Sequence, residues 1–124
     1  MLEKSKPSLR NFMGEGFYDG FSIAKATSEH ANILQHNLRD SDVRECIIHG
    51  ASPFRALMSG VREKGENYTC IIDGQPICMF GVNPIMNSMI GRIWLLGSYE
   101  IENRRRKFVR WSQSVVNYYQ EKYY

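Results

Sequence analysis

The spacing of apolar residues changes along this chain, and the change constrains the fold more than any single motif does. From Tyr68 to Leu96, short apolar runs replace the helical spacing found on either side. Such runs are typical of β-strands, and Asp73-Gly74 is a typical turn sequence for a two-residue hairpin loop. The sequence therefore predicts an antiparallel meander with strands at 68–72, 77–82 and 92–96.

Three helices are predicted before this meander, each from a capping residue followed by apolar residues at helical spacing. They cover about 28–38, from 42 to the stop at Gly50, and 53–65. Their predicted N-caps are, in order, Thr27 or Ser28, Asp42, and Ser52 ahead of Pro53. A short first strand is predicted at 21–25, and one apolar seam predicts a last helix from about 103 to the end.

This order of elements places the chain in the α/β (α+β) class, with helices on both faces of a mixed, mostly antiparallel sheet. The length of 124 residues, with 43% hydrophobic and 23% charged residues, fits one globular domain. Residues 1–20 mix charge with glycine and show no steady period, so we expect an N-terminal arm there and a domain over 21–124.

Cysteine usage and apolar run lengths bear on the compartment. No run approaches the ~20 residues that cross a bilayer, and the first residues lack a secretion signal. The cysteines, Cys46, Cys70 and Cys78, are odd in number and lack the spacing of a zinc site. The hairpin would place Cys70 opposite Ile77, so that Cys70 and Cys78 point to opposite faces. We therefore expect an intracellular protein with inert thiols and no metal.

The net charge of +3 comes entirely from the residues after Ser98. Its centre is Arg104-Arg105-Arg106-Lys107, at the start of the predicted last helix, where cations oppose the helix dipole. The run is either a site for phosphate, nucleic acid or an acidic partner, or a solvated face partly neutralised by Glu100 and Glu102. Nucleic acid is the less favoured ligand, because Trp111 and the nearby tyrosines have the helical spacing of a core.

Three segments resemble a known group of proteins. They are Asn37-Leu38-Arg39-x-x-Asp42-Val43-x-Glu45, Asp73-Gly74-x-Pro76-Ile77-x-Met79-Phe80-Gly81-Val82, and Ile93-Trp94-Leu95-Leu96-Gly97-Ser98. Together they are similar to the GNAT-related proteins of short-tailed bacteriophages, which include internal virion or core proteins. The resemblance covers roughly Phe21 to Tyr124 and implies the GNAT acyltransferase fold, with acetyl-CoA as the candidate cofactor. The candidate cofactor contacts that it implies are Leu95, Leu96, Gly97, Arg104, Arg105 and Arg106.

Two departures from the family indicate a degenerate acyl-CoA site. The sequence stops at Tyr124, so the GNAT-like sheet would lack the C-terminal strands and helix of the full fold. GNAT enzymes also bind the CoA pyrophosphate with a glycine-rich turn, whereas no glycine follows Gly97 up to Arg106 here. Glu100 and Glu102 would repel the anion.

Two functions remain as hypotheses. The first is a structural, internal virion or partner-binding phage protein, located in the host cytoplasm and the virion, that forms homo-oligomers or binds other phage proteins. Its expected interface residues are Arg92, Trp111, Tyr118, Tyr119, Tyr123 and Tyr124. The second is an active N-acetyltransferase acting on a host amine. Its catalytic residues are unassigned, because none of the candidate acids and bases stands out; these are Glu45, His49, Asp73, Tyr99 and Glu100.

Overall fold

The structure is a computed structural model that describes residues 21–62, 66–84 and 91–123. The arm expected at residues 1–20 lies outside these described residues. The elements are β1 (Phe21–Lys25), α2 (Ser28–Leu34), α3 (Asp40–Ile48), α4 (Pro53–Arg62), β2 (Glu66–Ile72), β3 (Gln75–Pro84), β4 (Gly91–Gly97), α5 (Glu100–Asn103) and α6 (Arg105–Tyr123). None of the helices in the described ranges is long and apolar enough to cross a membrane.

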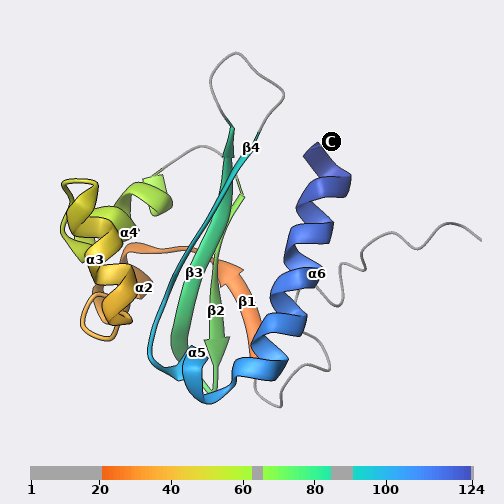
Figure 1. Ribbon diagram of the computed structural model, residues 1–124, viewed down its shortest axis with the longest axis horizontal. Coiled ribbons are helices and arrows are strands. Elements are labelled where there is room, and N and C mark those ends of the chain that lie inside the picture. Colours follow the sequence, from red (N-terminus) through yellow and green to blue (C-terminus); the bar gives the residue numbers. More distant parts are fainter. Residues whose placement is uncertain (1–20, 63–65, 85–90, 124) are drawn as a thin grey trace, which may run out of the picture.

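The four strands form one sheet in the order β1-β2-β3-β4, and each neighbouring pair is antiparallel. Helices α2, α3 and α4 cover one face of this sheet, and α6 covers the other (Figure 1). The predicted α+β class with helices on both faces is therefore confirmed. The expected mixed character is corrected, since every pairing among the described strands is antiparallel, as the short connections in the meander favour.

The starts and ends of the helices differ from prediction at three places. Helix α2 ends at Leu34, before the expected 38, because the chain turns there and Leu38 bridges to Ser98. Helix α3 begins at Asp40 with Arg39 as its N-cap, so Asp42 lies inside the first turn and is not the cap. The last helix, expected from about 103, begins at Arg105 as α6, and a separate short helix, α5, precedes it with a turn at Arg104.

The hairpin between β2 and β3 turns at Asp73-Gly74, as predicted. Both residues have positive φ values, 51° and 79°, which is the backbone conformation of a type I′ turn. Ile72 pairs with Gln75 across the turn, and this pairing is also the predicted one. The turn chemistry thus fixes the register of the first pair.

A β-bulge shifts the register two residues further along. Cys70 pairs with Cys78, and Ile77 is an extra residue on the β3 side. The carbonyl of Ile77 accepts a hydrogen bond of 2.9 Å from the backbone N–H of Ser98, just after β4. The predicted pairing of Cys70 with Ile77 is wrong for this reason, and the two cysteines lie in one core instead of on opposite faces.

Each face of the sheet has its own core. The core under α6 is rich in aromatic residues, and Trp111 contacts Phe80 edge to face with ring centroids 5.1 Å apart. The core under the three short helices is smaller and is built from aliphatic residues, among them Leu34, Leu57 and Met79. This second core positions the helices over β3 and β4, where the candidate site lies.

Candidate functional site

The C-terminal end of β4 is closed by the N-terminal end of α3. The N–H of Gly97 donates a hydrogen bond of 2.9 Å to Oδ2 of Asp42, and the Gly97 carbonyl accepts one of 2.9 Å from the N–H of Arg39. The Arg39 guanidinium donates to the same carboxylate oxygen at 2.8 and 2.9 Å. Asp42 therefore supports Gly97 with a charge-assisted bond and is itself neutralised by Arg39.

The amides that follow Gly97 are also used within the protein. The N–H of Ser98 donates to the carbonyl of Ile77 at 2.9 Å, and the N–H of Tyr99 donates to the carbonyl of Asn37 at 3.2 Å. In the GNAT resemblance, amides of this turn would bind the CoA pyrophosphate. Here they have protein acceptors, and a carboxylate stands where an anion would approach. The junction therefore does not fit the pyrophosphate.

The free edge of β4 is different from its C-terminal end. Both peptide groups of Gly97 point away from β3, and antiparallel strands alternate the direction of successive peptide groups. The N–H and C=O groups of Leu95 and Ile93 therefore point away from β3 as well. Among the described residues, these outward N–H and C=O groups have no backbone hydrogen-bond partner.

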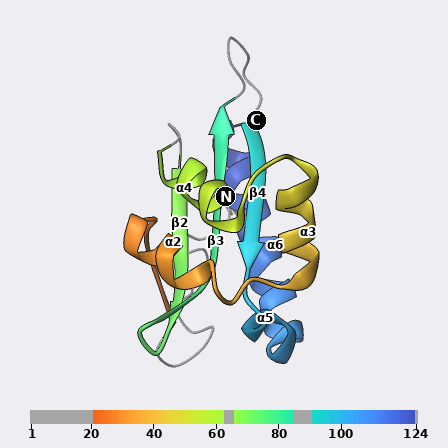
Figure 2. The same cartoon turned by 90° about the vertical axis from the view of Figure 1, so that its left-hand side faces the viewer.

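A groove of about 570 Å³ runs along this edge, between β4 and the helices α3 and α4. Helix α3 lies in the helical layer on the outer side of β4 (Figure 2). The apolar wall of the groove is formed by Ile93, Trp94, Leu95 and Leu96. Its opposite wall carries polar and charged side chains from the helices, namely Asp42, Glu45, His49, Arg55 and Ser59.

Trp94 is held in the groove wall by two neighbours. Its indole Nε1–H donates a hydrogen bond of 2.9 Å to Oδ1 of Asn67, which is a buried residue of β2. Gly60 of α4 lies against the indole ring so closely that a Cβ there would collide with it. The helix can thus approach the sheet at this point because Gly60 has no side chain.

Two of the candidate acids and bases lie in this groove. His49 Nε2 is 3.5 Å from Oε1 of Glu45, one helical turn away, and both side chains are largely exposed. Cys46 also lines the groove, and burial, followed by the negative charge of Asp42, raises the pKa of its thiol. The thiol therefore stays protonated and is a weak nucleophile.

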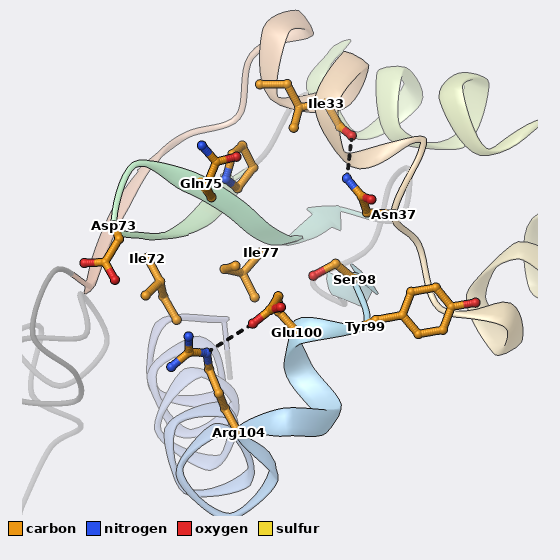
Figure 3. A pocket seen from close by; sticks show the side chains of 11 residues that line it. Ile33, Asn37, Ile72, Asp73, Gln75, Ile77, Ser98, Tyr99, Glu100 and Arg104 are labelled. Atoms are coloured by element: carbon orange, nitrogen blue, oxygen red, sulfur yellow. Dashed lines mark hydrogen bonds and ion pairs between the residues drawn. The ribbon is translucent and has the colours of Figure 1, made fainter.

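The other three candidates, Asp73, Tyr99 and Glu100, lie around a second cavity of about 410 Å³, near the turn between β2 and β3 (Figure 3). Glu100 Oε2 lies 3.7 Å from Nε of Arg104. The Tyr99 hydroxyl points away from the cavity and donates to Asp40 at 2.5 Å, a bond that raises the pKa of the phenol. The five candidates are therefore divided between two cavities.

The predicted cofactor residues do not converge on one site. Leu95 packs toward the α6 core and Leu96 toward the core of the short helices. Arg104 is half-buried beside Glu100, whereas Arg105 and Arg106 are exposed on the first turn of α6. Leu95 and Leu96 line the groove, whereas Arg104 lines the second cavity and Arg105 lines another one beside α6.

The predicted interface residues are also corrected in part. Trp111 and Tyr119 are 2% and 1% exposed, because α6 turns them onto the sheet, so they pack in the core. The Tyr119 hydroxyl donates to the carbonyl of Glu66 at 3.2 Å. Tyr118 is half-buried beside it. The side chains of Arg92 and Tyr123, and all of Tyr124, lie outside the described residues.

No family model, no curated protein and no solved structure matches this chain. Within the part of the chain that the structure describes, no three histidine, cysteine or acidic side chains come together as metal ligands would. Sequence reasoning missed Gly60 and Arg55 as groove residues and Asn67 as the hydrogen-bond partner of Trp94, since no local pattern joins them to β4. The function is therefore argued from the β4 edge and its groove.

Proposed function

We propose that this chain is a partner-binding protein on a GNAT-like scaffold, of the kind found among internal virion proteins of short-tailed bacteriophages. Its acyl-CoA site is degenerate, and the free edge of β4 is its docking strand. The partner is a second copy of the chain, in the host cytoplasm or the virion. The order of strand, helices, three strands and helix, with helices on opposite faces, supports the GNAT-like assignment.

The observation that carries the proposal is the contrast between the two parts of β4. The peptide groups of Gly97 are bonded to α3, while those of Ile93 and Leu95 face outward in the described structure. An exposed strand edge is a template for pairing with another strand, unless charge, proline or a covering element blocks it. Ile93, 43% exposed, adds an apolar side chain to this edge.

The edge is self-complementary, which favours a second copy over an unrelated chain. Around a two-fold axis at Trp94, Ile93 of one copy would lie opposite Leu95 of the other, and Leu95 opposite Ile93. Each of these pairs can exchange both of its outward backbone hydrogen bonds. A symmetric dimer would then have one continuous antiparallel sheet across its interface.

The test is sedimentation velocity of the full chain over a concentration series, with Ile93→Pro compared with Ile93→Val. Proline removes the outward N–H and leaves the ladder with β3 intact, because the N–H of Ile93 is not part of that ladder. Valine keeps the N–H and most of the side chain. We expect the wild-type and valine proteins to dimerise, and the proline variant to associate at least about tenfold more weakly.

Circular dichroism checks that Ile93→Pro remains folded. Two results would contradict the proposal: a wild-type chain that stays monomeric at high micromolar concentration, or a proline variant that dimerises as tightly as the valine variant.

A second candidate function, N-acetyl transfer to a host amine, is favoured by one observation. Glu45 and His49 lie together in the groove that the outward peptide group of Leu95 borders. Either side chain could accept a proton from an amine bound there. Calorimetric titration with acetyl-CoA separates the two functions. We expect no heat of binding, whereas saturable binding, with stabilisation of about 2.7 kcal/mol at a hundredfold excess over Kd, would favour the enzyme.

A further inference from the structure

Cys70 and Cys78 form a buried thiol pair that the groove and the β4 edge do not use. The two residues are direct partners across β2 and β3, and neither is exposed to solvent. Their thiols are free in this structure, and the neighbouring Cys70 side chain contributes to a raised pKa of the Cys78 thiol. The β-bulge at Ile77 creates this pair, since the turn alone would place Ile77 opposite Cys70.

The backbone geometry suits a disulfide. Direct partners on antiparallel strands have Cα atoms about 4.5–5.5 Å apart, which lies within the range of about 4.4–6.8 Å found in disulfides. The Cβ atoms of such cross-strand partners are generally about 4.5–5.5 Å apart, whereas the Cβ–Cβ distance in a disulfide is about 3.5–4.5 Å. The two strands therefore need to approach each other by roughly 1 Å. Gly97, the partner of Cys78 on β4, has no side chain to crowd the bond.

We propose that Cys70 and Cys78 are an oxidation site. The two residues form a disulfide with each other, and the oxidant is a low-molecular-weight disulfide such as oxidised glutathione. One cysteine thiolate attacks the glutathione disulfide, forms a mixed disulfide and releases one glutathione. The second cysteine then attacks the cysteine sulfur of the mixed disulfide and releases the other glutathione. The two cysteines are oxidised, and their protons end on the two glutathione thiols.

The surroundings of the pair predict a slow reaction. Burial, followed by the contact with Cys70, raises the pKa of the Cys78 thiol well above its usual range, so little thiolate is present. Ile101 of α5 packs in the same core and lies against Gly97, beside Cys78. We therefore expect oxidation to proceed through local opening at the junction of β4 and α5, and Ile101→Ala to accelerate it.

The experiment incubates the full native chain with oxidised glutathione, removes the oxidant, and counts thiols by alkylation under denaturing conditions and mass spectrometry. Of the three cysteines, we expect one to remain alkylatable, with no glutathione attached. Cleavage before Asp73 separates Cys70 from Cys78 in the sequence, so an intact disulfide keeps the two fragments joined until it is reduced. Cys46→Ser should leave this result unchanged, and Cys70→Ser should abolish it.

A parallel sample in urea measures what the fold contributes. If the native pair favours the bond, the fraction oxidised at equilibrium in a glutathione redox buffer is higher for the folded chain than for the unfolded chain. The proposal is overturned if the folded chain keeps all three thiols while the unfolded chain oxidises, or if the disulfide involves Cys46. It is also overturned if folded Ile101→Ala, with its more accessible pair, gives only mixed disulfides with glutathione.

Discussion

The two faces of the sheet are both covered by helices, yet different interactions attach the helices to them. On one face, the single helix α6 packs Trp111, Val115 and Tyr119 against the strands in an aromatic core. On the other face, three short helices bury a smaller aliphatic core. Directed polar contacts tie this second layer together, from Asp42 to Gly97 and within the cap of α2.

The two kinds of interaction contribute differently to the stability of the fold and to the positions of its parts. Apolar burial contributes free energy in proportion to area and has no preferred direction, about 25 cal/mol per Å². A hydrogen bond contributes only about 1 kcal/mol net, but it fixes the positions of two particular atoms. We therefore expect the α6 face to supply most of the free energy of folding. The face of the short helices, by contrast, sets the position of the β4 edge and its groove.

The largest expected effect is on the α6 face. Trp111→Ala removes a side chain that contacts the rings of Phe21, Phe80 and Phe108, and we expect a loss of about 3–5 kcal/mol in the free energy of unfolding. Val109→Ala, on the same helix but 61% exposed, should change stability by less than about 0.5 kcal/mol. Urea unfolding measures both. If Trp111→Ala lowers the free energy of unfolding by less than a substitution in the polar contacts of the other face does, the α6 face does not supply most of the stability.

The next effect is at the closed end of β4. Asp42→Ala leaves the N–H of Gly97 and the guanidinium of Arg39 without their acceptor, so we expect a loss of about 2 kcal/mol. Asp40→Ala is the control, because Asp40 is an exposed residue of the same helix whose hydrogen bond, from the Tyr99 hydroxyl, does not involve Gly97, and its loss should cost less. Amide hydrogen exchange gives a local readout: exchange at Gly97 should become faster in Asp42→Ala alone.

If both aspartate variants destabilise the chain equally and leave exchange at Gly97 unchanged, the polar contact does not position the end of β4. The closed and open parts of that strand would then be equivalent.

A smaller effect is expected where α4 approaches the groove wall. Gly60→Ala gains about 1 kcal/mol in helix propensity, but the added methyl group collides with the Trp94 ring, and overpacking commonly costs about 1–3 kcal/mol. Because Asn67 holds the indole by its Nε1–H, we expect a net loss of about 1 kcal/mol. Trp94→Phe in the same chain should relieve the collision and reduce this loss. Ser59→Ala, an exposed neighbour, should be close to neutral.

The sequence predicted the elements well because their signals are local. Asp73-Gly74 set the type I′ turn, and Ser52 caps α4 through a hydrogen bond of 3.2 Å from the N–H of Arg55, as expected for an N-cap. The bulge at Ile77 could not be predicted in this way, since it depends on Ser98, which is distant in sequence and donates to the bulged carbonyl. The thiol pair was missed for the same reason.

The candidate site was less predictable than the fold. Asp42 has the local signal of an N-cap. Its carboxylate instead accepts a hydrogen bond from the N–H of Gly97, and this contact depends on the packing of α3 against β4. Trp111 was expected at an interface although its helical spacing is that of a core residue, and its burial follows from that spacing. Long-range contacts decide both roles.

The smallest expected effect is a pH dependence of stability that is confined to the face of the short helices. His30 closes the capping box of α2: its Nδ1 accepts a hydrogen bond of 3.3 Å from the N–H of Thr27, which requires the neutral imidazole. Burial lowers the pKa of His30 below its usual 6.5, and the charge of Glu29 offsets this only in part. Between the lowered pKa and 6.5 the unfolded chain binds more protons, so stability falls as pH falls through that window.

His30→Gln isolates this contribution, because glutamine can cap the same helix and does not titrate. We expect the wild type to lose stability relative to His30→Gln between about pH 7 and about pH 5, by well under 1 kcal/mol, since the ring is only half-buried and solvent screens it. Other titrating groups cancel in this difference. A difference that stays constant with pH, measured by urea unfolding, would mean that the cap does not depend on the neutral imidazole. The cap of α2 on the face of the short helices would then contribute no more to the pH dependence of stability than the α6 face does.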